Sequence, residues 1–364
     1  MTVEQTYLAL LRSALWGTDM PVVDNVQEVL ELADRQKTRG LVYELLLRSG
    51  VEIPPETSCQ MQRMLMRIVN THLVFDRVIK RTVSALQEAS IPCVLLKGEG
   101  VARYYPNPRL RECGDVDLYI GPERLEEALR LLAPMADRVA DRQNGKHWEL
   151  KISQVEVELH QHSMQPETRR RARLFPSEEI DGLTRNLIPL DFDGVSVDTP
   201  ADTFNAFYLF YHAWHHFADG KGVGLRQLCD WTLLLHARSG YIDREHLRVV
   251  LEGMNLIKPW QLFGSIAVQQ LGLPSEEFPF YDDSRPRAYS RVLRLVLDDG
   301  NFGMGRRNYH KRRKGYLAGK LSSFSCHCQR FFLVFPLAPR ATLSRLPVIL
   351  FKGFQRVFQD LFHH

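Results

Sequence analysis

The sequence has no run of apolar residues long enough to cross a bilayer. The longest, residues 331–338, contains Pro336, whereas a spanning helix needs about 20 apolar residues. The start of the chain carries Glu4 where a secretory signal would carry positive charge, so no signal peptide is expected. These absences predict a cytoplasmic protein.

Cysteine is sparse and forms no disulfide framework. Six cysteines are scattered over 364 residues, which in a chain without an export signal favours free thiols in a reducing compartment. Cys326-His327-Cys328 lacks a second ligand pair at zinc-finger spacing, so the sequence predicts no zinc finger.

Acidic residues are absent from one long segment near the C-terminus. Residues 306–356, called the basic segment below, hold twelve Lys or Arg and no Asp or Glu, leaving 35 basic against 43 acidic residues elsewhere. The basic segment is expected to bind nucleic acid or an anionic surface. The alternative is that it packs over the acidic body or stays solvated.

Apolar periodicity predicts helices on both sides of a small α/β unit. The chain is therefore divided into four regions: N-terminal helices over 1–90, a core of strands and helices over 91–195, a helical domain over 196–300 and a basic region over 301–364. Helices are expected over residues 26–33, 41–47, 59–89, 204–217, 225–236 and 244–256. Strands are expected over residues 91–96, 115–120, 147–152 and 155–160. The fold class is therefore α/β of the α+β type, with a small mixed sheet.

Two of the predicted strands alternate acidic and apolar residues. Side chains i and i+2 share one face of a strand, about 6.5 Å apart. Asp115 and Asp117 therefore lie on one face, and Glu156 and Glu158 repeat the pattern on the second strand. Such a carboxylate cluster repels itself unless cations neutralise it.

The acidic pattern suits metal-dependent nucleotidyl transfer, which depends mainly on positioning and charge neutralisation. Asp115 and Asp117 are candidate ligands of Mg²⁺ or Mn²⁺. A third carboxylate is expected to bind metal or act as a base, and spacing alone leaves Glu156 and Glu158 open.

The residues before the aspartates offer positive charge for a triphosphate. Lys97 and Gly98 follow the first predicted strand, where an amine and backbone N–H groups can hold phosphates. The alternative is an ordinary turn with a surface lysine. Arg111 is favoured over Arg109 as a partner of phosphate or a brace for the carboxylates.

These motifs resemble the DNA polymerase β-type nucleotidyltransferase superfamily, which has a strand, a glycine turn, a helix and then an Asp-x-Asp strand. The run Leu95-Leu96-Lys97-Gly98, Gly114-Asp115-Val116-Asp117 and Glu158-Leu159-His160 is similar to a group of stand-alone bacterial proteins known as uncharacterised nucleotidyltransferases, over about residues 25–250. The resemblance implies a polymerase β-like core in which Asp115, Asp117 and Glu158 are catalytic and bind metal. Lys97 and Gly98 stand where many members have Gly-Gly or Gly-Ser.

The resemblance extends to two later helices, which carry Phe210-Tyr211-His212 and an Arg226-x-x-x-Asp230 pattern. Histidines on such an apolar helix are more often packed in the core, and contact of His212 and Asp230 with an acceptor pocket is the alternative.

The sequence thus predicts an enzyme that transfers a nucleoside monophosphate from an NTP to an unidentified acceptor. Addition of AMP to a protein side chain is a variant of the same chemistry. The alternative is a catalytically inactive nucleotidyltransferase-fold binding module that acts through its basic C-terminal region.

Overall fold

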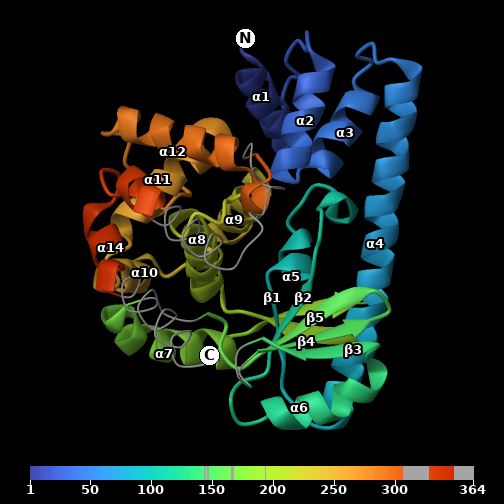
Figure 1. Cartoon of the computed structure of the whole chain (residues 1–364), viewed down its shortest axis with the longest axis vertical. Coiled ribbons are helices and arrows are strands. Elements are labelled where there is room, and N and C mark those ends of the chain that lie inside the picture. The colour runs from blue at the N-terminus through green and yellow to red at the C-terminus, as the bar shows by residue number, and fades with distance from the viewer. Residues whose placement is uncertain (143–144, 146, 165–167, 193, 306–327, 348–364) are drawn as a thin grey trace, which may run out of the picture.

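A computed structural model describes residues 1–142, 145, 147–164, 168–192, 194–305 and 328–347. Its N-terminal part is helical, as the apolar periodicity predicts, and consists of α1 (Val3–Trp16), α2 (Val26–Gln36), α3 (Arg39–Arg48) and α4 (Pro55–Glu88). Thr2 begins α1 with a reciprocal capping box to Gln5, and Pro55 begins α4 at a position where its missing N–H costs nothing. The 34-residue helix α4 runs from the N-terminal helices down to the sheet (Figure 1).

A seven-stranded mixed sheet lies beside the lower part of α4, with strand order β3-β4-β5-β2-β1-β7-β6. Its strands are β1 (Val94–Leu96), β2 (Val116–Tyr119), β3 (Arg138–Asp141), β4 (His147–Ile152), β5 (Val155–His160), β6 (Ile188–Phe192) and β7 (Val195–Thr199). Strand β2 pairs antiparallel with β1 and parallel with β5, so the three motif-bearing strands are central neighbours.

One face of the sheet is closed by α4 and by α6 (Leu125–Leu132). Val116, Leu118 and Val157 are almost fully buried there and share a hydrophobic core with Ile79 and Val83 of α4. Burial of these apolar side chains fixes the register of the strands, because a slip by one residue would turn them to the other face. The acidic residues are therefore held on the opposite face.

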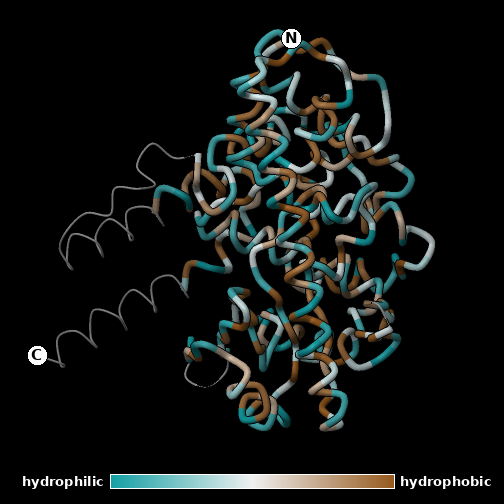
Figure 2. Tube along the Cα trace, turned by 90° about the vertical axis from the view of Figure 1, so that its right-hand side faces the viewer, coloured by the Kyte–Doolittle hydropathy of each residue, from teal (hydrophilic) through white to brown (hydrophobic). Residues whose placement is uncertain are grey.

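The second core lies among helices that follow the sheet. These elements are α7 (Arg169–Thr184), α8 (Asp202–Ala218), α9 (Leu225–Arg238), α10 (Arg244–Gly253), α11 (Ile257–Ser265), α12 (Pro286–Asp299) and α14 (Pro339–Leu343). Trp214, Trp231 and Trp260 are fully buried, and α8 is buried nearly all round. Hydrophobic and hydrophilic residues alternate along the trace (Figure 2), as expected for elements that bury one side.

Short helical turns connect these elements. They are α5 (Gly98–Ala102), η1 (Pro108–Leu110), η2 (Ala133–Met135), η3 (Ser239–Tyr241), η4 (Ile266–Gln270) and η5 (Asn301–Gly303). Helix α5 follows β1 directly and begins after Lys97, at the edge of the site described below.

The predicted α+β class, with a mixed sheet between helical regions, is confirmed. The hairpin over 147–152 and 155–160 is found at the predicted residues. Three strands, β3, β6 and β7, and helix α7 were not predicted. No helix among the described residues has the length and apolarity needed to span a membrane.

Most of the basic segment, 306–327 and 348–356, lies outside the described residues. In the described part, Arg330 pairs with Asp299 at 2.9 Å and Arg345 pairs with Asp219, and both arginines are buried. These two ion pairs fit the alternative in which the basic segment packs over the acidic body.

Candidate functional site

Strand β2 presents the two aspartates. Asp115 stands one residue before β2 and Asp117 lies within it, with only 1% of Asp117 exposed. Val116 and Leu118 point into the core shared with α4, which confirms the alternation predicted from the sequence. The carboxyl group of Asp117 therefore faces away from that core.

Strand β5 supplies a third carboxylate. Its parallel register with β2 places Glu158 beside Asp117, and ligand oxygens of Asp115, Asp117 and Glu158 lie within 4.8 Å of one another. We call these three residues the acidic cluster. Glu156 is exposed and stands opposite Lys151 of β4, outside this cluster. Of the two glutamates that spacing left open, Glu158 is the one that joins the aspartates.

Lys97 reaches the acidic cluster from the turn between β1 and α5. Its Nζ is 3.1 Å from Asp117 Oδ2. Its φ of 48° and ψ of −144° are unusual for a residue with a side chain, a conformation that costs about 1–3 kcal/mol and is found mainly at functional sites. Burial alone would lower the pKa of Lys97, but the neighbouring Asp117 raises it, so the amine is charged. Gly98 follows with φ 42° and continues the turn.

Two histidines complete the surroundings of the acidic cluster. His160 Nε2 lies 3.0 Å from Asp117 Oδ1 and 3.2 Å from Glu158 Oε2. Burial alone would lower the pKa of His160, but these two carboxylates raise it to about 9. His147 stacks on His160 and its Nε2 lies 3.1 Å from Glu158. The sequence signal for His147 was available, since a hairpin that pairs 152 with 155 also pairs 147 with 160.

The three carboxylates differ in their affinity for protons. Repulsion by Asp117, together with burial, raises the pKa of Asp115. Burial would raise the pKa of Asp117 as well, but Lys97 and His160 outweigh it and the pKa is lowered. Burial would raise the pKa of Glu158, but the neighbouring His147 and His160 outweigh it and hold the pKa well below its usual range. Asp115 is therefore the strongest base of the three.

Helix α8 borders the cluster through His212, whose Nε2 is 3.3 Å from Lys97 Nζ. Burial, and then the positive charge of Lys97, lowers the pKa of His212 well below its usual value. A neutral His212 accepts a hydrogen bond from the Lys97 ammonium group. His212 thus lies next to the acidic cluster, and its predicted contact with an acceptor stays a prediction.

Arg111 is buried in an ion pair with helix α9. Its Nε lies 2.8 Å from Asp230 Oδ1, and its Nη2 lies 2.8 Å from Asp230 Oδ2. The hydroxyl of Tyr105 donates to the same carboxylate at 2.6 Å. This geometry ties the loop before β2 to α9, and the predicted contact of Arg111 with phosphate stays a prediction.

The donor set of the acidic cluster fits a hard divalent cation. Three carboxylates from neighbouring strands offer the oxygen ligands that Mg²⁺ and Mn²⁺ prefer. Lys97 and His160 neutralise part of this charge through contacts with Asp117, so a cation entering the cluster competes with them.

A mixed sheet with a carboxylate cluster on two neighbouring strands defines an α+β protein with a candidate divalent-cation site. Residues 23–272 match the model of a family described as uncharacterised nucleotidyltransferase. Because the match spans more than half of the chain, the protein belongs to that family.

Curated proteins and solved structures show little similarity to this chain. No curated protein matches the sequence. A solved structure of an antigenic nucleotidyltransferase-like protein from Paracoccidioides brasiliensis is similar over 56% of this chain and 95% of its own, with 14% identity and a TM-score of 0.35. That similarity is too low to carry an argument.

Proposed function

We propose that the protein is a metal-dependent nucleotidyltransferase of the DNA polymerase β type, which transfers a nucleoside monophosphate from an NTP to an acceptor and releases pyrophosphate. The observation that carries the proposal is the convergence of Asp115, Asp117 and Glu158 within 4.8 Å on two central strands. Family membership supports the same chemistry. The acceptor, a hydroxyl, a phosphate or a protein side chain, is left open.

Asp115, Asp117 and Glu158 would hold Mg²⁺ or Mn²⁺. When bound, such ions neutralise the phosphate charge and lower the pKa of an acceptor hydroxyl. The acceptor oxygen forms a bond to the α-phosphorus, and the bond from that phosphorus to the bridging oxygen breaks, with its electron pair leaving on pyrophosphate. The acceptor proton passes to a carboxylate of the cluster, and Glu158 or a neighbouring carboxylate would act as the base.

Lys97 and Gly98 would bind the triphosphate. In the ligand-free protein the Lys97 ammonium group stabilises Asp117. With a cation in the cluster, Lys97 would be free to pair with the phosphates, and the backbone N–H of Gly98 would donate to them. The positive φ of Lys97 is strained, and strained backbone of this kind clusters at ligand-binding sites, which supports a binding role for this turn.

One observation favours a second candidate function, a catalytically inactive binding module that acts through the basic segment. Lys97 and His160 already contact both oxygens of Asp117. A cluster neutralised by its own side chains is stable without metal, and in that case the fold serves only as a scaffold. The two functions make opposite predictions about Mg²⁺.

A thermal-shift experiment separates them. The melting temperature of the full chain is measured with an NTP, with and without Mg²⁺, for wild type, Asp115→Ala and the control Asp198→Asn, which changes an exposed aspartate of β7. A catalyst shows a Mg²⁺-dependent shift in wild type and control that Asp115→Ala loses, together with pyrophosphate release. Equal behaviour of wild type and Asp115→Ala would reject catalysis.

A further inference from the structure

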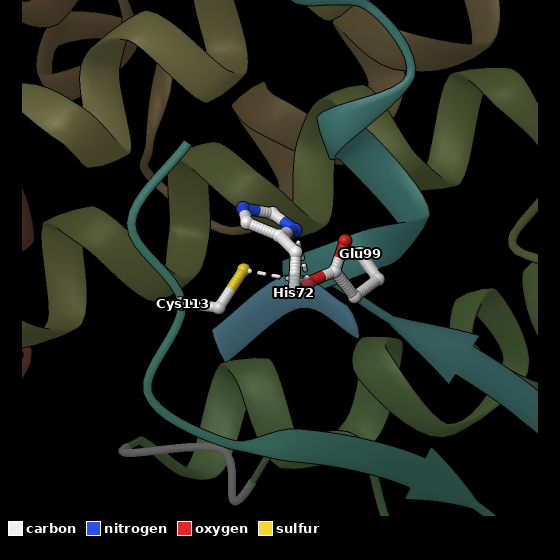
Figure 3. A group of neighbouring side chains, drawn as sticks. All are labelled: His72, Glu99 and Cys113. Atoms are coloured by element: carbon white, nitrogen blue, oxygen red, sulfur yellow. Dashed lines mark hydrogen bonds and ion pairs between the residues drawn. The ribbon is translucent and has the colours of Figure 1, made fainter. Parts of the chain in front are cut away.

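Three side chains from distant parts of the sequence converge in the structure (Figure 3). They are His72 of α4, Glu99 of α5 and Cys113 of the loop before β2. His72 is 1% exposed and Glu99 7%, and Cys113 is partly buried. Glu99 Oε1 lies 2.9 Å from His72 Nδ1 and 3.0 Å from Cys113 Sγ. We call these three residues the His-Glu-Cys cluster.

The protonation of His72 follows from its two neighbours. Its Nε2 lies 2.5 Å from the backbone carbonyl oxygen of Arg111. A carbonyl oxygen only accepts, so Nε2 carries a hydrogen. In the neutral ring Nδ1 then presents a lone pair toward the carboxylate of Glu99. Two lone pairs at 2.9 Å need a positive species between them, which is either a proton or a metal ion.

The donor atoms select the kind of metal. Zn²⁺ binds imidazole nitrogen, carboxylate oxygen and thiolate sulfur at about 2.0–2.3 Å in a tetrahedral arrangement, whereas Mg²⁺ keeps to oxygen ligands. Neighbouring ligand atoms at such bond lengths are about 3.3–3.7 Å apart. The 2.9 and 3.0 Å separations of the cluster therefore need to open by only a few tenths of an ångström.

We propose that His72, Glu99 and Cys113 bind one Zn²⁺ or a similar transition-metal ion, through Nδ1, a carboxylate oxygen and the thiolate. The thiol loses its proton to solvent when sulfur binds the metal. Three protein ligands would leave one tetrahedral position without a protein ligand. This site is separate from the acidic cluster and takes a different class of metal.

Arg111 orients two of the three ligands. Its carbonyl group fixes which nitrogen of His72 is free, and its Nη1 donates to Cys113 Sγ at 2.9 Å. Hydrogen bonds of this kind to a ligand's remaining nitrogen or sulfur set ligand orientation in metal sites. The charge of Arg111 is balanced by Asp230, so the guanidinium group does not leave a net positive charge against the metal.

The metal would hold together the segments that build the active site. Glu99 belongs to helix α5, which follows the turn that carries Lys97, and Cys113 precedes Asp115 by two residues. Both segments are thereby tied to His72 on the long helix α4. Loading is expected to stabilise the chain, with a rise in Tm of about 2–5 °C at a hundredfold excess over Kd.

Titration of the chelator-treated full chain with Co²⁺ tests the site, because thiolate bonded to Co²⁺ gives a near-ultraviolet charge-transfer band. We expect one equivalent of thiolate-bound Co²⁺ in wild type and loss of the band in Cys113→Ser. The control is the double variant Cys326→Ser, Cys328→Ser, which removes the only Cys-His-Cys sequence and should retain the band. Absence of the band in wild type, or its persistence in Cys113→Ser, would overturn the proposal.

Two further measurements keep this site apart from the active site. Asp117→Asn should retain the band, and a large excess of Mg²⁺ should not reduce it, since Mg²⁺ does not compete for thiolate. Loss of the band in either experiment would mean that thiolate binding of Co²⁺ depends on the acidic cluster, which would contradict two separate sites. Because the readout is spectroscopic, it stands even if no nucleotidyl transfer is found.

Discussion

The acidic cluster and the His-Glu-Cys cluster share the same two segments. The turn after β1 places Lys97 against the first cluster, and helix α5, which follows that turn, gives Glu99 to the second. The chain before β2 gives Asp115 to the first and Cys113 to the second. Their surroundings differ, however. The acidic cluster is on the face of the sheet, with carboxylates only, while the other cluster lies against α4 and combines nitrogen, oxygen and sulfur donors.

This difference shows how neighbouring residues can serve two roles, a catalytic cation site and a structural metal site, according to their donor atoms and their backbone positions. Strand alternation repeats one chemical group at short range, which concentrates negative charge for a hard cation. Convergence of two helices and a loop brings unlike donors together, which suits a softer cation and a structural role. Substitutions that affect only one cluster can test whether the division is real.

The largest expected effect is the loss of nucleotidyl transfer when a residue of the acidic cluster is substituted. Asp117→Asn removes the charge of the most buried carboxylate and should reduce nucleotidyl transfer by about 10³-fold or more. The rate is measured as pyrophosphate release from NTP with Mg²⁺. Asp198→Asn, in an exposed position on β7, should retain the wild-type rate. Equal rates in both variants would mean that the acidic cluster has no catalytic role.

Arg111 contacts the His-Glu-Cys cluster through Cys113, and Asp230 of α9 holds its guanidinium group in place. Asp230→Asn leaves a buried guanidinium group without its counter-charge, so the free energy of unfolding should fall by about 3–5 kcal/mol. Asp202→Asn breaks the more exposed bidentate pair with Arg238 and should cost only about 1 kcal/mol. Urea unfolding measures both. Similar losses in the two variants would show that Arg111 is not a structural link.

The sequence allowed prediction of the acidic cluster because strand alternation is a local rule. Asp115, Asp117 and Glu158 follow from spacing and resemblance, and β4 and β5 follow from a hairpin with a two-residue turn. His147 could also have been placed by that register. The polymerase β relationship and the residue roles stay predictions.

The remaining elements could not be predicted for identifiable reasons. Strand β6 contains Pro189, which is tolerated because β6 is an edge strand but weakens the strand pattern. Strand β3 is the opposite edge and is largely exposed, so it lacks a clear apolar alternation. The His-Glu-Cys cluster joins positions 72, 99 and 113 from three separate elements. No sequence spacing encodes such a tertiary contact.

A smaller effect distinguishes the two glutamates of β5. Glu158→Gln removes a cluster carboxylate and should reduce transfer by about 10²-fold, whereas Glu156→Gln should change it less than about twofold. Both variants alter the same strand and the same charge, so each is the matched control for the other. A greater loss in Glu156→Gln would mean that the parallel register of β2 and β5 does not define the catalytic carboxylate.

The smallest effect concerns His212, which borders the acidic cluster but not the His-Glu-Cys cluster. Burial and Lys97 lower its pKa in the folded protein, while the unfolded chain takes up a proton near pH 6.5. The unfolded state therefore binds more protons, and stability should fall as the pH drops below about 6.5. Between pH 7.5 and 5.5, wild type should lose about 1 kcal/mol more than His212→Gln in urea unfolding. Parallel pH curves for the two proteins would mean that His212 titrates normally and that Lys97 does not repel its proton.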